Sequence, residues 1–232
     1  MTDSQGNSRV PRAIGSMVVA LVVVVVALVV AAWQPARAGA AAVVDSQRIS
    51  VTTLEAKTAG LIAARQRYGV PPAPLADLTR DQLTALISSR VLEQAARQLG
   101  VNVSPAEIDT RRRELESQLG GPEALASQGA LEGVAPEEQQ GAIRDLLRYE
   151  KIGQALVPDA RTVDRQQERD IASQELLTRV SREMQITVNP RYGTWNPDER
   201  VVLPAQDDFI APPAAPRSGG PVLLWPGEIP GE

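Results

Sequence analysis

The sequence predicts a mainly α fold, with a small β element joining its N- and C-terminal segments and one apolar helix preceding it. Three observations support this prediction. Blocks of apolar residues with helical spacing follow one another from about residue 52 to residue 184. Short segments rich in β-branched residues lie at both ends of these blocks, at 43–51 and 185–189. An uncharged, mostly apolar run covers residues 13–33.

The run at 13–33 is long enough to cross a bilayer, because about 20 helical residues span about 30 Å. Arg9 and Arg12 precede it, so we expect residues 1–12 in the cytoplasm and the body of the chain outside. A cleaved secretory signal is the alternative, since Ala36-Arg37-Ala38 and Ala38-Gly39-Ala40 both fit a cleavage site. The body is therefore either tethered to the cell membrane by a single pass or secreted.

Composition excludes several kinds of chemistry. The 232 residues contain no Cys and no His. Disulfides, thiol nucleophiles, a Ser-His-Asp relay and imidazole metal ligands are thus unavailable. The net charge of −4 argues against a general nucleic-acid binder. We expect no enzyme activity, no catalytic residues, no cofactor and no metal.

The predicted organisation has five parts. After residues 1–12 and 13–33 comes an Ala-rich tether at 34–42, then one helical domain at 43–197. Residues 198–232, rich in Pro, Gly and Ala, are expected to be a mostly disordered tail.

Capping signals give the expected helix starts. Thr52 with Glu55 has capping-box spacing, and Thr79 with Gln82 begins the next helix. The clearest start is Ser104-Pro105-Ala106-Glu107, in which Ser caps, Pro takes the first helical position and Glu closes the box. A short helix is expected within 122–135, with longer helices at about 136–156 and 161–184.

The order of several segments resembles a known family, the N-terminal domain of SurA-type and PrsA-type extracytoplasmic foldases. This family belongs to the trigger factor/SurA peptide-binding class. The segments are the hairpin ending Ile49-Ser50, the helix 83–99 running into Gly100–Ile108, the helix 142–156 and the closing segment Ile186–Gly193. The resemblance implies a helical chaperone domain whose two ends meet. It also implies binding of unfolded or exported polypeptides outside the cytoplasm.

The chain departs from this family in two respects. Many members carry a parvulin-type prolyl isomerase domain, where this chain has only the short stretch near 157–165 and no His. Isomerase activity is therefore not carried over. PrsA-type members are often lipoproteins, whereas this chain lacks the Cys that a lipid anchor requires.

Binding of polypeptide clients requires apolar surface that the fold leaves uncovered. The candidates lie beside glycine-rich turns: Leu115, Leu119, Leu125, Leu131 and Val134. The alternative is that these side chains complete the core. We expect Tyr192 and Trp195 to pack the last strand against the helices rather than to stack on a ligand.

The leading functional hypothesis is a chaperone-like binding module without catalysis. A second hypothesis is a structural or adaptor protein of the cell envelope, in which one dedicated partner docks on the helical body or the Pro-rich tail. An enzyme using Ser, Lys or carboxylates has no supporting motif.

Overall fold

The computed structural model describes residues 39–205, and the chain divides into two compact units at Ala38 and Gly39. The predicted segments 1–12 and 13–33 and the tail beyond residue 205 lie outside the described residues. None of the helices among the described residues is long and apolar enough to cross a membrane.

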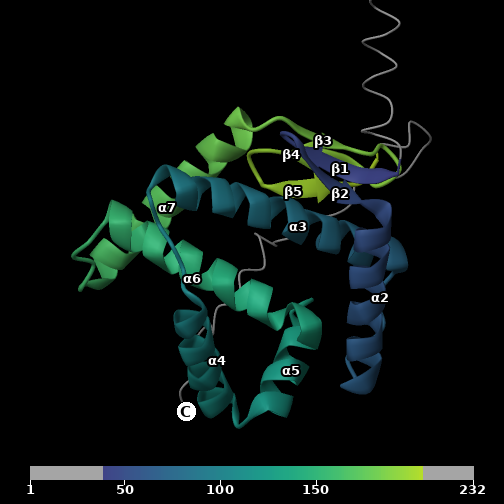
Figure 1. Ribbon diagram of the computed structural model, residues 1–232, viewed down its shortest axis with the longest axis horizontal. Helices are drawn as coiled ribbons and strands as arrows, with labels where there is room; N and C mark the ends of the chain where they lie inside the picture. The colour runs from purple at the N-terminus through teal and green to yellow at the C-terminus, as the bar shows by residue number, and fades with distance from the viewer. Residues whose placement is uncertain (1–38, 206–232) are drawn as a thin grey trace, which may run out of the picture. The chain divides into compact units, whose positions relative to one another are not determined.

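The unit that begins at Gly39 is mainly helical, as predicted (Figure 1). Its strands and helices in chain order are β1 (Ala40–Val44), β2 (Gln47–Ser50), α2 (Val51–Arg67), α3 (Leu75–Gln98), α4 (Pro105–Leu119), α5 (Pro122–Leu131), the 3-10 turn η1 (Pro136–Glu138), α6 (Gln139–Leu156), α7 (Val163–Glu183), β3 (Ile186–Val188), β4 (Thr194–Asn196) and β5 (Val201–Leu203).

Two of the three predicted N-cap residues are wrong. The capping box of α4 is confirmed, since Ser104 Oγ accepts from Glu107 N–H at 3.3 Å and the Glu107 carboxylate accepts from Ser104 N–H at 2.8 Å. Helix α2 is instead capped by Ser50, whose hydroxyl accepts from Thr53 N–H at 3.0 Å. Helix α3 begins four residues before Thr79, at Leu75, because Pro74 already has a φ suited to entering a helix.

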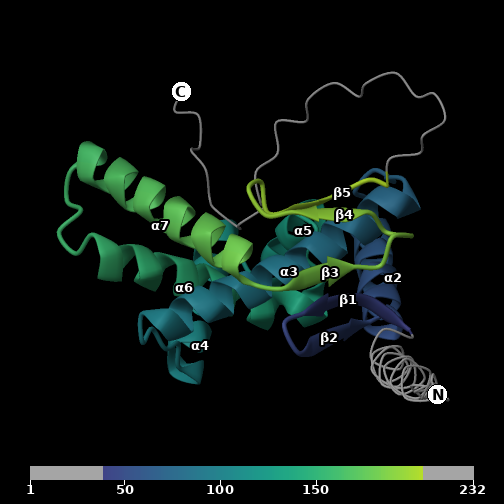
Figure 2. The same ribbon diagram turned by 90° about the horizontal axis from the view of Figure 1, so that it is seen from above.

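The first and last predicted strands pair, so the two ends of the helical body meet. The three-stranded sheet has the order β2-β1-β3, and Ala42 lies opposite Val188 in an antiparallel register. Asn189 extends the pairing, because its backbone N–H donates to Ala41 C=O at 2.9 Å. Figure 2 shows β1 and β3 side by side over α3.

The predicted tether at 34–42 is wrong for its last three residues. Ala40, Ala41 and Ala42 belong to β1 and are 4%, 0% and 1% exposed, because small side chains let this strand lie close to the helices. Val51 N–H also donates to Gly39 C=O at 3.0 Å. A signal cut after Ala40 would therefore remove part of the sheet, whereas a cut after Ala38 would leave it whole.

The predicted boundary at residue 197 is also wrong, since Val201–Leu203 forms β5 rather than part of a disordered tail. β5 pairs with β4, and Val202 is 6% exposed in the core. The turn before β4 contains Gly193 at φ 127°, where a Cβ would lie 1.9 Å from Leu203 C=O oxygen. Only glycine permits this close approach.

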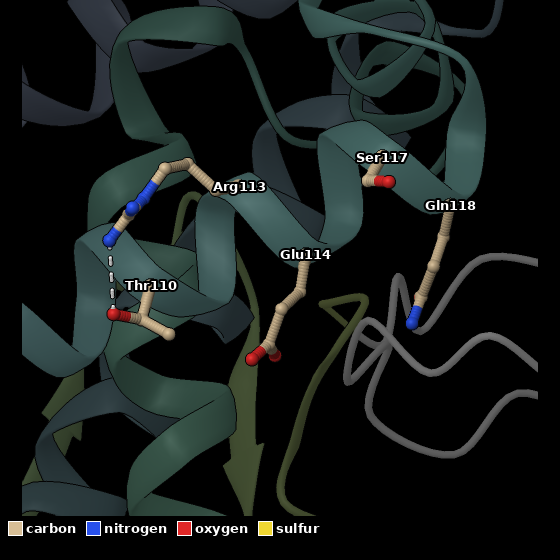
Figure 3. Close-up of a pocket in the computed structure, with 5 residues that line it drawn as sticks. All are labelled: Thr110, Arg113, Glu114, Ser117 and Gln118. Carbon is tan, nitrogen blue, oxygen red and sulfur yellow. Dashed lines mark hydrogen bonds between the residues drawn. The ribbon is translucent and has the colours of Figure 1, made fainter.

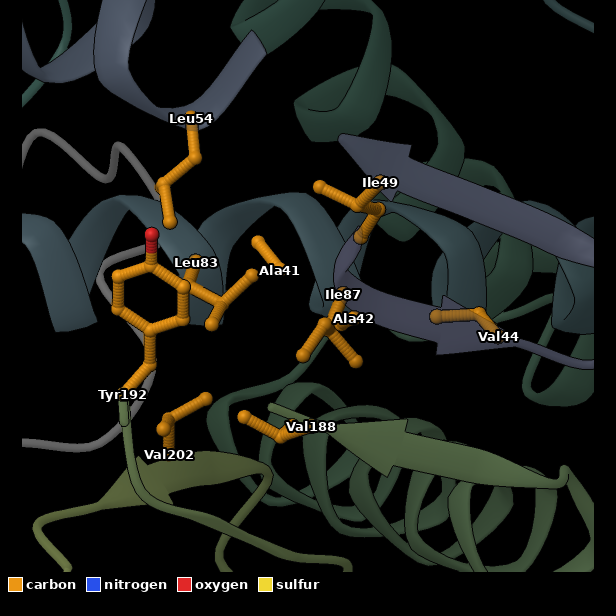
Figure 4. Close-up of a cluster of buried hydrophobic side chains, with 10 residues drawn as sticks. All are labelled: Ala41, Ala42, Val44, Ile49, Leu54, Leu83, Ile87, Val188, Tyr192 and Val202. Carbon is orange, nitrogen blue, oxygen red and sulfur yellow. The ribbon is translucent and has the colours of Figure 1, made fainter. Parts of the chain in front are cut away.

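Helix α3 is the centre of the core. Leu83 and Ile87 are fully buried against the sheet, with Leu54, Val188 and Tyr192 (Figure 4). Further along α3, Val91, Leu92 and Ala95 pack on α6 and α7, in a second cluster that includes Ile152, Leu177 and Val180. Helix α3 is thus buried first against the sheet and then, toward its C-terminal end, against α6 and α7.

The two aromatic residues after β3 pack against the helices, as predicted. Tyr192 is 9% exposed in the cluster with Leu83, and Trp195 donates from Nε1 to Ser181 Oγ at 3.2 Å. They hold the last strands against α3 and α7.

Arg200 also links the segment before β5 to α7. It is 6% exposed, and its guanidinium donates to Thr178 Oγ1 at 2.5 Å and to Gln174 Oε1 on α7. Burial lowers the pKa of Arg200, because the charged form loses hydration. Its φ of 54° is unusual for a residue other than glycine, so the α7 contacts hold a backbone conformation that costs about 1 kcal/mol.

A chain ending at Met184 should be strongly destabilised relative to one ending at Ala205. The shorter chain loses three buried apolar side chains, those of Val188, Tyr192 and Val202, each worth about 1.5 kcal/mol or more. We expect a loss of about 4 kcal/mol or more in the free energy of unfolding, measured by urea denaturation. Equal midpoints for the two chains would show that the ends do not support one another.

Candidate functional site

Two of the five predicted surface residues are core residues. Leu115 and Leu125 are 8% and 7% exposed, and they pack with Ile108 and Ile143 in a small third cluster. They face inward because α4 and α5 fold back on α6 and bury their apolar stripes there. We therefore exclude Leu115 and Leu125 as contact residues for a client.

The other three candidates are accessible. Leu119 at the end of α4 is 38% exposed and Leu131 at the end of α5 is 57% exposed, while Val134 is half-buried. The chain turns between α4 and α5 at Gly120 and Gly121, whose φ values are 97° and 122°. The end of α5 is therefore the most exposed of the predicted positions.

Hydrogen bonds from α2 and α3 fix the end of α5. Gln82 donates from Nε2 to Gly133 C=O at 2.7 Å, and Arg65 donates from Nη1 to Ala130 C=O at 3.3 Å. Arg65 also donates from Nη2 to Pro71 C=O at 2.7 Å, which brings the α2–α3 loop to the same place. Leu131 is thus held in position although its side chain is exposed.

Leu75 is an exposed apolar residue that the sequence analysis missed. It is 62% exposed at the first position of α3, and seven residues, about two helical turns, separate it from Gln82. This spacing places Leu75 on the face of α3 that carries the bond to Gly133. We call Leu75, Leu131 and Val134 the Leu75–Leu131 surface.

Helix α7 carries two exposed apolar residues as well. Val163 is 79% and Ile171 is 52% exposed, but charged and amide residues fill most of the helix between them. The first half of α7 is therefore mostly solvated, which makes these two residues a useful comparison for the Leu75–Leu131 surface.

Two hollows on the described part of the chain are lined mainly by polar and charged residues. One is lined by residues of α4 alone, as Figure 3 shows: Thr110, Arg113, Glu114, Ser117 and Gln118. Arg113 donates to Thr110 across it at 3.2 Å. Binding sites for small molecules usually have apolar walls. No apolar residue lines this hollow, so the exposed leucines are the stronger candidate.

Charged contacts hold α4 on α6. Lys151 forms an ion pair with Glu107 at 2.5 Å and donates a hydrogen bond to Asn102 C=O at 2.7 Å. Arg111 forms an ion pair with Glu150 at 2.6 Å. The bond from Lys151, with those from Ser104 N–H and hydroxyl, lowers the pKa of Glu107 to about 2. The lowered value means that the ionised carboxylate supports this end of α4.

Comparison with protein families identifies part of the chain. Residues 9–117, just under half of the chain, match the model of the SurA-like N-terminal domain. These residues are similar to a SurA-like N-terminal domain. Neither the curated proteins nor the solved structures contain a significant match to the chain.

The SurA-like match confirms the resemblance predicted from the sequence and associates the protein with a chaperone family. It ends within α4, whereas β3 completes the sheet that β1 and β2 begin. The described part of the match, residues 39–117, therefore shares one folded unit with the helices and strands that follow it. The Leu75–Leu131 surface lies partly in each, with Leu75 inside the matched range and Leu131 beyond it.

Acidification should loosen α4 from α6. A carboxyl whose pKa is lowered on folding contributes stability above its ordinary value of 4.5, and this stability is lost as the pH falls through about 2. We expect the difference in urea midpoint between the wild type and Glu107→Gln to shrink over this range. A difference that stays constant from pH 6 to pH 2 would contradict the role assigned to Glu107.

Proposed function

We propose that the protein is a chaperone-like binding module that takes up unfolded or exported polypeptides on the Leu75–Leu131 surface, without catalysis. The observation that carries this proposal is the exposure of two leucines, Leu75 at 62% within the SurA-like match and Leu131 at 57% beyond it. Apolar contact is non-directional, so this surface suits clients of many sequences.

The size of the surface predicts weak binding. Covering two half-exposed leucines is worth about 2–4 kcal/mol, which corresponds to millimolar affinity for one short segment. Clients would therefore be polypeptides with several apolar segments, and folded proteins with covered cores would not be retained. Weak, broad binding fits a protein that must release its clients without ATP.

We place the client-binding unit outside the cytoplasm. The proposal rests on the apolar run at 13–33 and on Arg9 and Arg12 before it. Protease added to intact spheroplasts should digest the chain beyond residue 40 and leave cytoplasmic proteins intact. Protection of this unit in intact spheroplasts, with digestion after lysis, would contradict the topology.

Prolyl isomerase activity is not part of the proposed function. Helix α6 ends at Leu156 and α7 begins at Val163, so the connection between them is too short to hold a folded domain. In a proline-peptide assay, the purified protein should not exceed the rate of the buffer. Isomerisation that increases with protein concentration would contradict this expectation.

Aggregation of an unfolded client tests the proposal directly. The unit from Gly39 onward should suppress aggregation of unrelated clients without ATP and with little dependence on salt. Leu75→Ser with Leu131→Ser should weaken this protection several-fold while the helicity and the urea midpoint stay close to wild type, because both side chains are exposed.

The matched control is Val163→Ser with Ile171→Ser, which removes the same kind of exposed side chain from α7. It should leave protection unchanged. Equal loss in both variants would contradict the assignment of the surface. If the wild type protects no client even in stoichiometric excess, the chaperone proposal fails, and a dedicated partner in the cell envelope becomes the better explanation.

A further inference from the structure

Helix α5, which lies between α4 and α2, is packed unevenly along its length (Figure 1). The buried residues among its ten are Leu125, Ala126, Gly129 and Ala130. Leu125 is the one large side chain of this set, and it packs with Ile143 near the N-terminal end of the helix. Toward its C-terminal end, α5 therefore buries only a glycine and an alanine, which remove little apolar area from water.

Glycines in the left-handed region of backbone conformation flank α5. Gly121 precedes it with a φ of 122°, and Gly133 follows it with a φ of 89°. A Cβ at either position would have no neighbour within 4 Å, so close packing is not what requires glycine there. Glycine moves between the left- and right-handed regions at little cost. The connections at both ends of α5 therefore allow a change in its orientation.

Buried polar atoms without a partner gather at the C-terminal end of α5. Within residues 39–205, Arg65 Nε, Glu132 Oε2 and Gln139 Nε2 are three of the five buried side-chain nitrogen or oxygen atoms that lack a hydrogen bond. Glu132 is the C-cap residue of α5, and a Cβ on Gly129 would lie 3.5 Å from Gln139 Nε2. A polar atom buried without a partner destabilises the conformation that buries it. The position of α5 against α2, which we call the closed position, is thus less stable than full pairing would make it.

The contacts that hold the closed position differ between the two ends of α5. At the N-terminal end, Glu123 accepts from the Tyr68 hydroxyl at 2.9 Å and pairs with Arg67 at 3.1 Å. At the C-terminal end, the hydrogen bonds from Gln82 and Arg65 both go to backbone carbonyls. Carbonyls of another polypeptide can replace these acceptors, so the C-terminal end is the one that a ligand can release.

We infer that the C-terminal end of α5 moves away from α2 and admits an extended segment of an unfolded polypeptide between the two helices. The inference deepens the proposed function and rests on it, because the opened site adjoins the Leu75–Leu131 surface. Opening uncovers the small apolar cluster of Ala64, Ala130 and Ala135. Leu125 stays in its cluster with Ile143, because α5 pivots about its N-terminal end.

The opened site suits the backbone of an extended chain. Each peptide unit carries one N–H donor and one C=O acceptor. Arg65 Nε and Gln139 Nε2 are donors for such carbonyls, and Glu132 Oε2 is an acceptor for such an N–H group. The small side chains of Ala64 and Ala130 let a backbone approach closely. Backbone contacts do not depend on the client's sequence, so they add to the weak binding expected of two leucines without narrowing the choice of client.

Thiol labelling tests the opening without any client, since the chain contains no Cys. Ala130 and Ala95 are both 0% exposed, but Ala95 lies in the core formed by α3, α6 and α7. In the full chain in lipid nanodiscs, iodoacetamide should label Ala130→Cys about tenfold faster or more than Ala95→Cys, because a thiol in the core is reached only when the unit unfolds. Equal rates would overturn the inference.

A second variant tests the role of the unpartnered atoms. Adding Gln139→Leu to Ala130→Cys removes one buried donor that lacks a partner, which stabilises the closed position. Labelling at position 130 should therefore become several-fold slower. Unchanged or faster labelling would contradict the assignment of Gln139 to the opened site.

A reversible crosslink tests whether clients use the opened site. Oxidation of Ala64→Cys with Ala130→Cys should hold α5 closed, because the two alanines pack in one cluster. Protection of a client that has no Cys should be several-fold weaker in the oxidised form than in the reduced form. The matched control is Val43→Cys with Thr187→Cys, which joins opposite positions of β1 and β3 and should protect equally in both forms.

The inference and the proposed function can fail separately in these experiments. If the reduced protein protects no client, the proposed function fails, whereas the labelling rates still decide whether α5 opens. If protection is the same in both forms of the 64–130 pair, the proposed function stands and the site between α2 and α5 is wrong.

Discussion

The pairing of β1 with β3 is the constraint on which the rest of the structure depends. It joins residues about 140 positions apart, with Asp45 N–H donating to Gln185 C=O at 2.8 Å at one end and Asn189 N–H donating to Ala41 C=O at the other. The entropy cost of closing so long a loop is offset by the burial of Leu83 and Ile87 beneath the sheet. Once both ends are fixed, α3 has a covered side along most of its length, and its first turn is left exposed.

The sequence predicted those elements whose signals are local. Ser104 with Glu107 determined the start of α4 because both partners of the cap lie within one turn. The pairing of the terminal strands was predicted through β-branched residues and the family resemblance. Strand β5 was not predicted, because Val201-Val202-Leu203 looks in the sequence like any other short apolar segment. Its partners, Thr194–Asn196 and Thr84, become neighbours only in the fold.

The same reasoning explains the mixed outcome at the candidate surface. Leu115 and Leu119 are four residues apart on α4, yet only Leu115 is buried, because α6 covers the middle of α4 and not its last turn. Spacing alone does not say where a covering helix ends. Leu75 was missed because the capping spacing of Thr79 and Gln82 placed the expected helix start at Thr79, whereas Pro74 is compatible with an earlier start.

The central claim is that the helical unit, closed by the pairing of β1 with β3, keeps a small apolar surface exposed for clients. Hydrogen exchange with and without an unfolded client tests this claim. Without a client, the N–H groups of Asp45 and Asn189 should exchange as slowly as those in the middle of α3, since all open only when the unit unfolds. With a client, protection should increase at the first turn of α3 and at the end of α5. Protection that increases instead on the polar face of α4, or fast exchange at Asp45 and Asn189, would contradict the account.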